Sequence, residues 1–207
     1  DYFSHFILLI EKLNENKFEE GIKISWKAIR ELKNRDFTPR AYIRLFLLQI
    51  IASTLRYEGF LEGRKAVIEY LKIVTEGDPP WFRIYQMYLY LCIQSREFST
   101  AVSVINLIFQ HRKFRRLTAI HKERWYLLRA YLAWLIVTGN AGEIEGEELH
   151  RFRVGRFVNE VRNIAKDKQG LNISILIIQC LWLTYQRKYS AARNRFVSLE
   201  RHGGRHL

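Results

Sequence analysis

Apolar side chains recur along this chain at spacings that fit α-helices. After Phe98 they occupy positions three or four residues apart, at Ala101, Val102, Ile105, Ile108 and Phe109. This spacing places them on one face of a helix, where they can pack against a neighbour. After Phe60 a similar series runs through Gly63, Val67, Tyr70, Leu71 and Val74. No clear strands are found, so the pattern predicts an all-α protein.

The periodicity predicts ten helices joined by short links. Thr38-Pro39 and Asp78-Pro79 carry start signals, a capping residue followed by proline in the first turn. In the first helix Phe3, Phe6, Ile7 and Ile10 are expected to point inward. An acidic insertion at 140–148 separates the seventh and eighth helices. The expected helices are Tyr2–Leu13, Phe18–Lys33, Pro39 to about Tyr57, Phe60–Thr75, Trp81–Ser95, Phe98–His111, Thr118–Thr138, Val154–Lys168, Asn172–Gln186 and Tyr189–Arg201.

A short pattern recurs four times and starts a helix each time. It reads polar, polar or Gly, aromatic, two spacers, then Gly or Ala, with its aromatic at Phe18, Phe60, Phe98 and Tyr189. The ring can close a corner between two helices, and the small residue three positions later allows the next helix to approach closely. A spacing of a few tens of residues, with two helices per unit, indicates a stacked helical array.

Asn16 to Ile29 resembles the second half of a tetratricopeptide repeat. Phe18 matches the corner aromatic of that family, and Gly21 and Ala28 match its two small positions. Trp125-x-x-Leu128 is similar to the Trp-x-x-Leu of the family's first helix, although Arg129 stands where the family has a small residue. Most units here are longer than the family's repeat of about 34 residues. The resemblance implies a right-handed α-solenoid of about five antiparallel helix pairs, which binds protein segments on a concave side lined by first helices. It implies no enzymatic activity.

Composition bounds the domain organisation. The 207 residues are 48% hydrophobic and 14% aromatic, which is too apolar for a disordered chain. We expect a single domain over residues 1–200 and a disordered tail over 201–207, which lacks apolar periodicity. Because the sequence starts at Asp1, we also expect a processed protein or a segment of a larger chain.

Cys92 and Cys180 lie inside apolar helical runs, so we expect buried free thiols and a cytoplasmic protein. The longest apolar run, at 173–178 and continuing to Leu183, is shorter than the roughly 20 residues that span a bilayer. We therefore expect no membrane span.

The sequence shows no catalytic or cofactor motif. None of the six histidines pairs with another histidine at i, i+4 or with a cysteine at ligand spacing. We expect no enzyme, no metal and no cofactor.

The net charge of +13 favours an anionic partner. One basic cluster, flanked by His111 and His121, contains Arg112, Lys113, Arg115, Arg116, Lys122 and Arg124. A second runs from Arg151 to Arg162. Such clusters suit phosphates or acidic peptides, but they also occur as solvated helix ends.

Two expected first helices carry a polar strip. In Trp81–Ser95, four residues match the groove-facing positions that the resemblance implies: Arg83, Gln86, Tyr90 and Gln94. In the helix from Thr118, a polar strip with Lys122, Tyr126 and Arg129 runs between two apolar stripes. These tyrosines could instead be core, with the arginines only extending past them to solvent.

Three hypotheses follow. The first is a non-enzymatic scaffold whose basic concave groove binds an acidic peptide or helix of a partner protein. The second is a nucleic-acid-binding helical repeat that uses the cluster from Arg112 to Arg124. The third is a regulatory segment of a larger multidomain chain. The sequence does not determine the oligomeric state.

Overall fold

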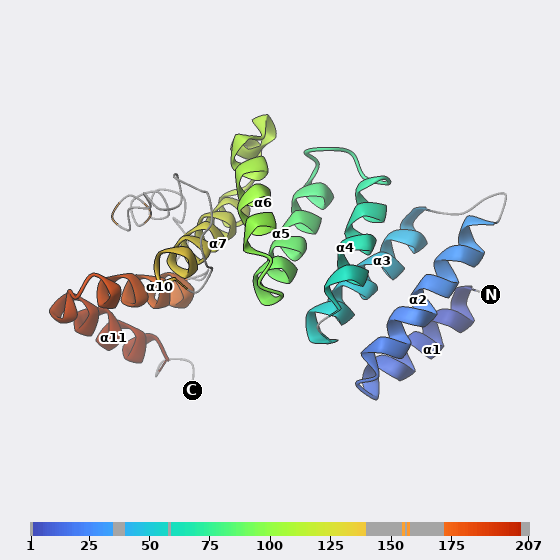
Figure 1. Ribbon diagram of the computed structural model, residues 1–207, viewed down its shortest axis with the longest axis horizontal. Coiled ribbons are helices and arrows are strands. Elements are labelled where there is room, and N and C mark those ends of the chain that lie inside the picture. The colour runs from blue at the N-terminus through green and yellow to red at the C-terminus, as the bar shows by residue number, and fades with distance from the viewer. Residues whose placement is uncertain are drawn as a thin grey trace. The chain divides into compact units, whose positions relative to one another are not determined.

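The computed structural model describes residues 2–34, 40–57, 59–139, 155, 157 and 172–203, and these residues form helices and connecting turns without strands. Figure 1 shows their order along the chain. The helices are α1 (Tyr2–Asn14), α2 (Phe18–Lys33), α3 (Arg40–Tyr57), α4 (Phe60–Leu71), α5 (Pro79–Gln94), α6 (Phe98–Gln110), the 3₁₀ helix η1 (Arg112–Arg116), α7 (Ala119–Val137), α10 (Asn172–Tyr185) and α11 (Tyr189–Gly203). None of them is long and apolar enough to cross a membrane.

The chain divides into two compact units, Asp1–Thr100 and Ala101–Leu207. In the first unit α1 and α2 form one antiparallel hairpin, and α3 and α4 form a second (Figure 1). Helix α3 packs against α2, α4 and α5, which explains why its sequence is apolar almost all round. Its side chains Phe46, Leu47, Ile50 and Ile51 are at most 1% exposed and form the centre of this unit.

The recurring pattern forms the same turn in three places. Asn16, Arg96 and Arg187 have φ values of 58°, 59° and 58°, in the left-handed region. The next residue donates its backbone N–H to the carbonyl five residues back: Lys17 to Lys12, Glu97 to Cys92 and Lys188 to Leu183, at 2.8–2.9 Å. These bonds end one helix in a Schellman motif, and the following helix begins at the aromatic residue.

The small residue of the pattern lies where two helices meet. A Cβ added to Gly21 on α2 would lie 3.3 Å from Leu9 Cδ1 and 3.4 Å from Leu13 Cδ2 of α1. A Cβ added to Gly63 on α4 would lie 2.6 Å from Thr54 Oγ1 and would also meet Leu91 of α5. Glycine therefore permits close helix approach at both positions.

In the second unit, α10 packs against both α7 and α11. Trp125, Leu132 and Ile178 are at most 1% exposed. Trp182 of α10 donates its indole N–H to the carbonyl of Ala130 on α7 at 3.4 Å, and Tyr185 donates its hydroxyl to the carbonyl of Val137 at 3.3 Å. These bonds tie α10 to the middle and end of α7.

The orientation expected for the first helix is wrong at three of its four positions, and only Phe6 is half-buried. Phe3, Ile7 and Ile10 are 59%, 54% and 41% exposed, whereas Leu9 is completely buried. Apolar residues occur all round this helix, so periodicity alone did not identify the side that packs on α2.

Some expected boundaries also differ. Helix α4 ends at Leu71 rather than Thr75, because the chain turns there, with Ile73 N donating to Tyr70 O at 3.1 Å. A β-turn follows, in which Asp78 N donates to Thr75 O at 3.2 Å and Gly77 has φ 75°. Helix α11 continues to Gly203, into the expected tail. The Thr38-Pro39 signal and the 140–148 insertion lie outside the described residues, as does the expected helix at 154–168 apart from Gly155 and Phe157.

Candidate binding surfaces

The α5 strip (Arg83, Gln86, Tyr90 and Gln94) lies on an accessible face of its helix. Arg83, Tyr90 and Gln94 are exposed, Tyr90 by 43%, and Gln86 is half-buried. The amide of Gln86 donates to the hydroxyl of Tyr90 at 3.4 Å. Because these residues repeat every three or four positions, they form one continuous polar row about 16 Å long on the helix surface.

The other side of α5 packs into the core. Phe82, Leu89 and Cys92 are at most 2% exposed. Burial raises the pKa of the Cys92 thiol to about 12, and it also raises the pKa of Cys180. Both cysteines are free and buried, so they remain protonated and are shielded from oxidants.

The α7 strip (Lys122, Tyr126 and Arg129) has a different environment. All three side chains are half-buried. The Tyr126 ring meets the Phe109 ring edge to face at a centroid distance of 5.2 Å, and the Arg129 guanidinium lies 4.8 Å from the Phe109 centroid. Tyr126 and Arg129 are therefore both already packed against Phe109. Because the α7 strip and the α5 strip lie in different units, we treat them as separate surfaces.

A 3₁₀ turn carries four of the six residues of the first basic cluster. Arg112 to Arg116 form η1, whose N-cap His111 accepts the backbone N–H of Lys113 on Nδ1 at 3.2 Å. Phe114 is 6% exposed, and its ring centroid lies 4.7 Å from that of Phe109. This single apolar residue inside the basic run is the sequence signal for an anchored turn.

We call the exposed arginines on and after this turn the basic turn: Arg112, Arg115, Arg116 and Arg124. None of the four forms an ion pair with another described residue. Lys113 and Lys122, predicted with them, are half-buried. Four arginines within a stretch of 13 residues are therefore open to solvent.

Charge is unevenly distributed along the chain. The described part of the second unit has twelve basic residues and two glutamates, and one of these, Glu123, is 4% exposed. The basic residues are Arg112, Lys113, Arg115, Arg116, Lys122, Arg124, Arg129, Arg187, Lys188, Arg193, Arg195 and Arg201. A surface this unbalanced attracts anions over distances of about 10 Å at moderate salt.

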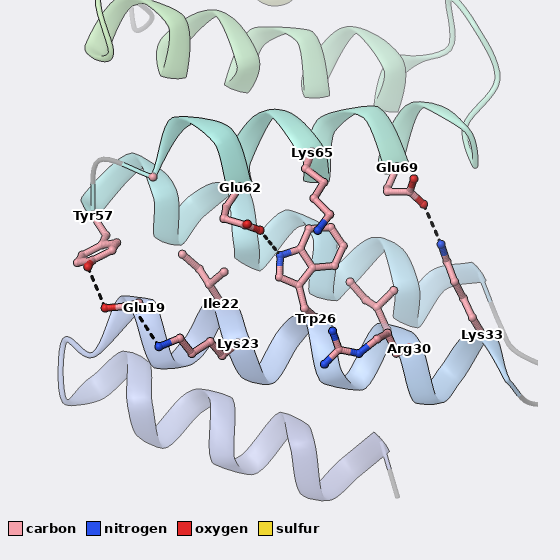
Figure 2. A pocket seen from close by; sticks show the side chains of 12 residues that line it. Glu19, Ile22, Lys23, Trp26, Arg30, Lys33, Tyr57, Glu62, Lys65 and Glu69 are labelled. Atoms are coloured by element: carbon pink, nitrogen blue, oxygen red, sulfur yellow. Dashed lines mark hydrogen bonds and ion pairs between the residues drawn. The ribbon is translucent and has the colours of Figure 1, made fainter.

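The sequence did not suggest a third surface, a groove between α2 and α4 (Figure 2). The α2–α4 groove encloses about 660 Å³. Helix α3, which packs against both helices, supports it from behind. Its lining is mostly apolar atoms with charged side chains along both walls. The lining residues are Glu19, Ile22, Lys23, Trp26, Ile29, Arg30, Lys33, Tyr57, Gly59, Glu62, Lys65 and Glu69.

Three hydrogen bonds cross the groove at regular intervals. Trp26 Nε1 donates to Glu62 Oε2 at 2.6 Å, and Lys33 Nζ donates to Glu69 Oε2 at 2.8 Å. At the other end the hydroxyl of Tyr57 donates to Glu19 Oε2 at 2.8 Å (Figure 2). Glu19, Trp26 and Lys33 are seven residues apart, which is about two helical turns, so α2 presents all three toward α4 and the end of α3.

Two of these carboxylates are held by neighbouring donors. The hydrogen bonds from Lys23 and then Tyr57 hold the pKa of Glu19 below its ordinary value. Lys33, and then Lys72, do the same to the pKa of Glu69. Both glutamates are therefore charged at neutral pH and already bound within the protein.

Among the described residues, no group of three or more His, Cys, Asp or Glu side chains could hold a metal ion. Comparison of this chain with protein-family models, with curated proteins and with solved structures gave no match.

Proposed function

We propose that this chain is a non-enzymatic interaction module, built as a tetratricopeptide-like solenoid, which binds an acidic segment of a partner protein through the α5 strip. One observation carries the proposal: Arg83, Tyr90 and Gln94 are exposed in a row, while the opposite side of the helix is buried. Arginine beside tyrosine is a composition common in binding hot spots. The guanidinium of Arg83 supplies a donor pair for a carboxylate.

The repeated turns support the solenoid part of this proposal. The left-handed residues Asn16, Arg96 and Arg187 each precede a helix-starting aromatic by two positions. A turn of one geometry, used again and again, sets the same angle between successive helices, as a stacked array requires. The two buried, free cysteines support a cytoplasmic location.

The test is capture of partners from native lysate, with half of the sample treated with nuclease. The bait proteins are the wild type, Arg83→Glu with Tyr90→Ala, and Lys27→Glu as control. Lys27 is exposed on α2 and does not belong to the α5 strip. We expect a defined protein that survives nuclease, binds the wild type and the control, and is lost from the double variant.

Two results would contradict this function. A partner that binds the double variant as well as the wild type, with unchanged circular dichroism, would exclude the α5 strip. Loss of all retained material on nuclease treatment would exclude a protein partner. It would instead favour the second candidate, a nucleic-acid-binding repeat.

The second candidate is supported by a separate observation, the basic turn together with the excess of cations in the second unit. Arg112, Arg115, Arg116 and Arg124 are exposed and form no ion pair with a described residue. Phosphate contacts need unpaired cations, since a guanidinium that already forms an ion pair within the protein has fewer N–H donors left for a phosphate. We propose a single-stranded nucleic acid as the ligand in this alternative, and its salt dependence is the test.

A further inference from the structure

The α2–α4 groove belongs to the second helices of two successive pairs, and it does not include any residue of the α5 strip. A ligand bound in this groove would therefore be distinct from the acidic segment proposed to bind the α5 strip. At about 660 Å³ it falls within the range of about 300–1,000 Å³ typical of ligand pockets. Its lining runs along α2 from Glu19 to Lys33, about 21 Å, so an elongated segment of chain fits it better than a compact small molecule.

The groove contains one bay between two of its bridging hydrogen bonds. Trp26–Glu62 bounds the bay on one side and Lys33–Glu69 on the other, about 10 Å apart along the helices. The buried side chain of Ile29 forms its floor. Arg30 extends from the α2 wall, and Lys65 extends from the α4 wall over the Trp26 ring (Figure 2).

The acidic side chains of the bay have hydrogen-bond partners within the protein, whereas its two cationic side chains form no ion pair with a described residue. Glu62 accepts from the Trp26 indole, and Glu69 accepts from Lys33 and Lys72. By contrast, neither Arg30 nor Lys65 forms an ion pair with a described residue, and Lys65 Nζ lies 4.7 Å from the Trp26 ring centroid. Both side chains are exposed. The bay can therefore accept an anion, while its carboxylates have little capacity left to receive a cation.

A ligand of the α2–α4 groove needs an apolar part as well as an anionic group. Trp26 is half-buried, and Ile22 and Ile29, four residues before it and three after it on α2, also line the groove and are 5% and 2% exposed. A ligand side chain that packs over this surface removes apolar area from water, which favours binding. A fully hydrophilic anion would not use this surface.

We propose that the α2–α4 groove is a docking site for an amphipathic helix of a partner protein, which places an aliphatic side chain beside Trp26 and a carboxylate between Arg30 and Lys65. This match of charge and polarity selects a helix with one aliphatic face and flanking glutamates. The cation-π contact of Lys65 with Trp26 holds the ammonium in place before the carboxylate arrives.

The probe is a fluorescein-labelled helical peptide of about 14 residues, long enough to cover the three bridging bonds, with leucines on one face and glutamates beside them. Its controls replace Leu by Ala or Glu by Lys. Binding is followed by fluorescence anisotropy and by the indole ¹H–¹⁵N signals of the five tryptophans, with Trp26 assigned from Trp26→Phe. We expect the Leu/Glu peptide to bind and to shift the Trp26 signal.

The variant Arg30→Gln with Lys65→Gln is expected to weaken binding about tenfold or more. Lys27→Gln, an exposed change on the same helix outside the groove, is expected to leave it unchanged. Equal binding of the Ala-for-Leu peptide would show attraction to general positive charge and would overturn the proposal. So would binding of the lysine peptide, failure of the Leu/Glu peptide to bind, or an unaltered Trp26 signal. Binding of the acidic peptide at the intact α5 strip would raise the anisotropy without shifting the Trp26 signal, so the Trp26 signal separates the groove from the α5 strip.

Discussion

The indole nitrogen of Trp26 donates a 2.6 Å hydrogen bond to Glu62, a residue 36 positions further along the chain. Lys33 and Glu69 repeat that separation of 36 residues. Both bonds join α2 to α4, the second helices of successive hairpins. They fix how far apart the two walls of the α2–α4 groove stand.

Removing the acceptor should loosen this junction. Glu62→Ala leaves the half-buried Trp26 N–H without its partner, so we expect the free energy of unfolding to fall by about 1 kcal/mol. The Trp26 indole proton should move upfield as its hydrogen bond is lost. Urea denaturation and a ¹H–¹⁵N spectrum measure the two effects. Glu62→Gln keeps an acceptor and should lose less than half as much. Equal losses in both variants would mean that the bond does not contribute.

The two buried glycines of the recurring pattern should respond differently to alanine. At Gly63 a methyl group would meet Leu91 and would lie 2.6 Å from Thr54 Oγ1, which donates to the Ile51 carbonyl at 2.8 Å. We expect Gly63→Ala to cost about 1–3 kcal/mol through overpacking. The measurement is the urea midpoint.

Gly21→Ala is the matched control. Its nearest contacts are side-chain ends of Leu9 and Leu13 at 3.3 and 3.4 Å, which can shift by a few tenths of an ångström. Alanine also favours the helix by about 1 kcal/mol over glycine. We therefore expect a change within about 0.5 kcal/mol of zero. If Gly63→Ala were equally harmless, close approach would not explain that glycine.

The repeated turn contains strain that can be relieved. Arg96 adopts φ 59°, a region that costs a residue with a side chain about 1 kcal/mol or more relative to glycine. Because Arg96 ends α5 rather than lying inside a helix, Arg96→Gly should raise stability by about 0.5–1 kcal/mol. Thermal unfolding measures the change. Arg64→Gly, an exposed position inside α4, should instead lower stability by about 1 kcal/mol. A loss in both variants would refute relief of strain.

The sequence predicted most helices to within a few residues, because the corner pattern and the apolar period are both local signals. Phe18, Phe60, Phe98 and Tyr189 each start a helix as expected. The orientation of α1 was missed for a physical reason. Leu9 is buried and Ile7 exposed, but both are aliphatic, and only the partner helix decides between them.

Surfaces were harder to predict than helices. The exposure of the α5 strip follows from its own periodicity, whereas the environment of Arg129 depends on Phe109, twenty residues earlier. The α2–α4 groove needed the spatial pairing of Trp26 with Glu62, which no local pattern encodes. Salt bridges and grooves of this kind depend on which helices pack together and on how far one helix is shifted along the other.

Acid should weaken the Lys33–Glu69 bond. Lys33, and then Lys72, lower the pKa of Glu69 from its ordinary value of 4.5. A lowered pKa gives stability that is present above 4.5 and is lost as the pH falls through the folded value. At pH 7 we expect Glu69→Gln to be less stable than the wild type by at most about 1 kcal/mol. Below the folded pKa the two urea midpoints should converge.

Gln110→Ala is the control for this comparison, since Gln110 is exposed on α6 and carries no ionisable group. Its difference from the wild type should stay constant between pH 7 and the acid limit. If the Glu69→Gln difference also stayed constant across that window, protonation of Glu69 would not account for the acid sensitivity.

The nucleic-acid alternative makes a quantitative prediction about salt. A fluorescein-labelled oligothymidine should bind the wild type with an affinity that falls linearly on a log–log plot against salt concentration. Each phosphate contact contributes a slope of about −0.7 for a single strand, because binding releases condensed counterions. Arg115→Gln with Arg116→Gln removes two exposed guanidinium groups from the basic turn, so the slope should become shallower by about 1.4.

Lys188→Gln with Arg193→Gln removes the same number of exposed charges from the same unit but outside the basic turn. This control should keep the wild-type slope and lose affinity only slightly through the weaker general field. Equal changes in both double variants would mean that the oligonucleotide responds to total charge rather than to the basic turn. A flat salt dependence of the wild type would remove the reason for a nucleic-acid ligand, because phosphate recognition by arginine necessarily displaces counterions.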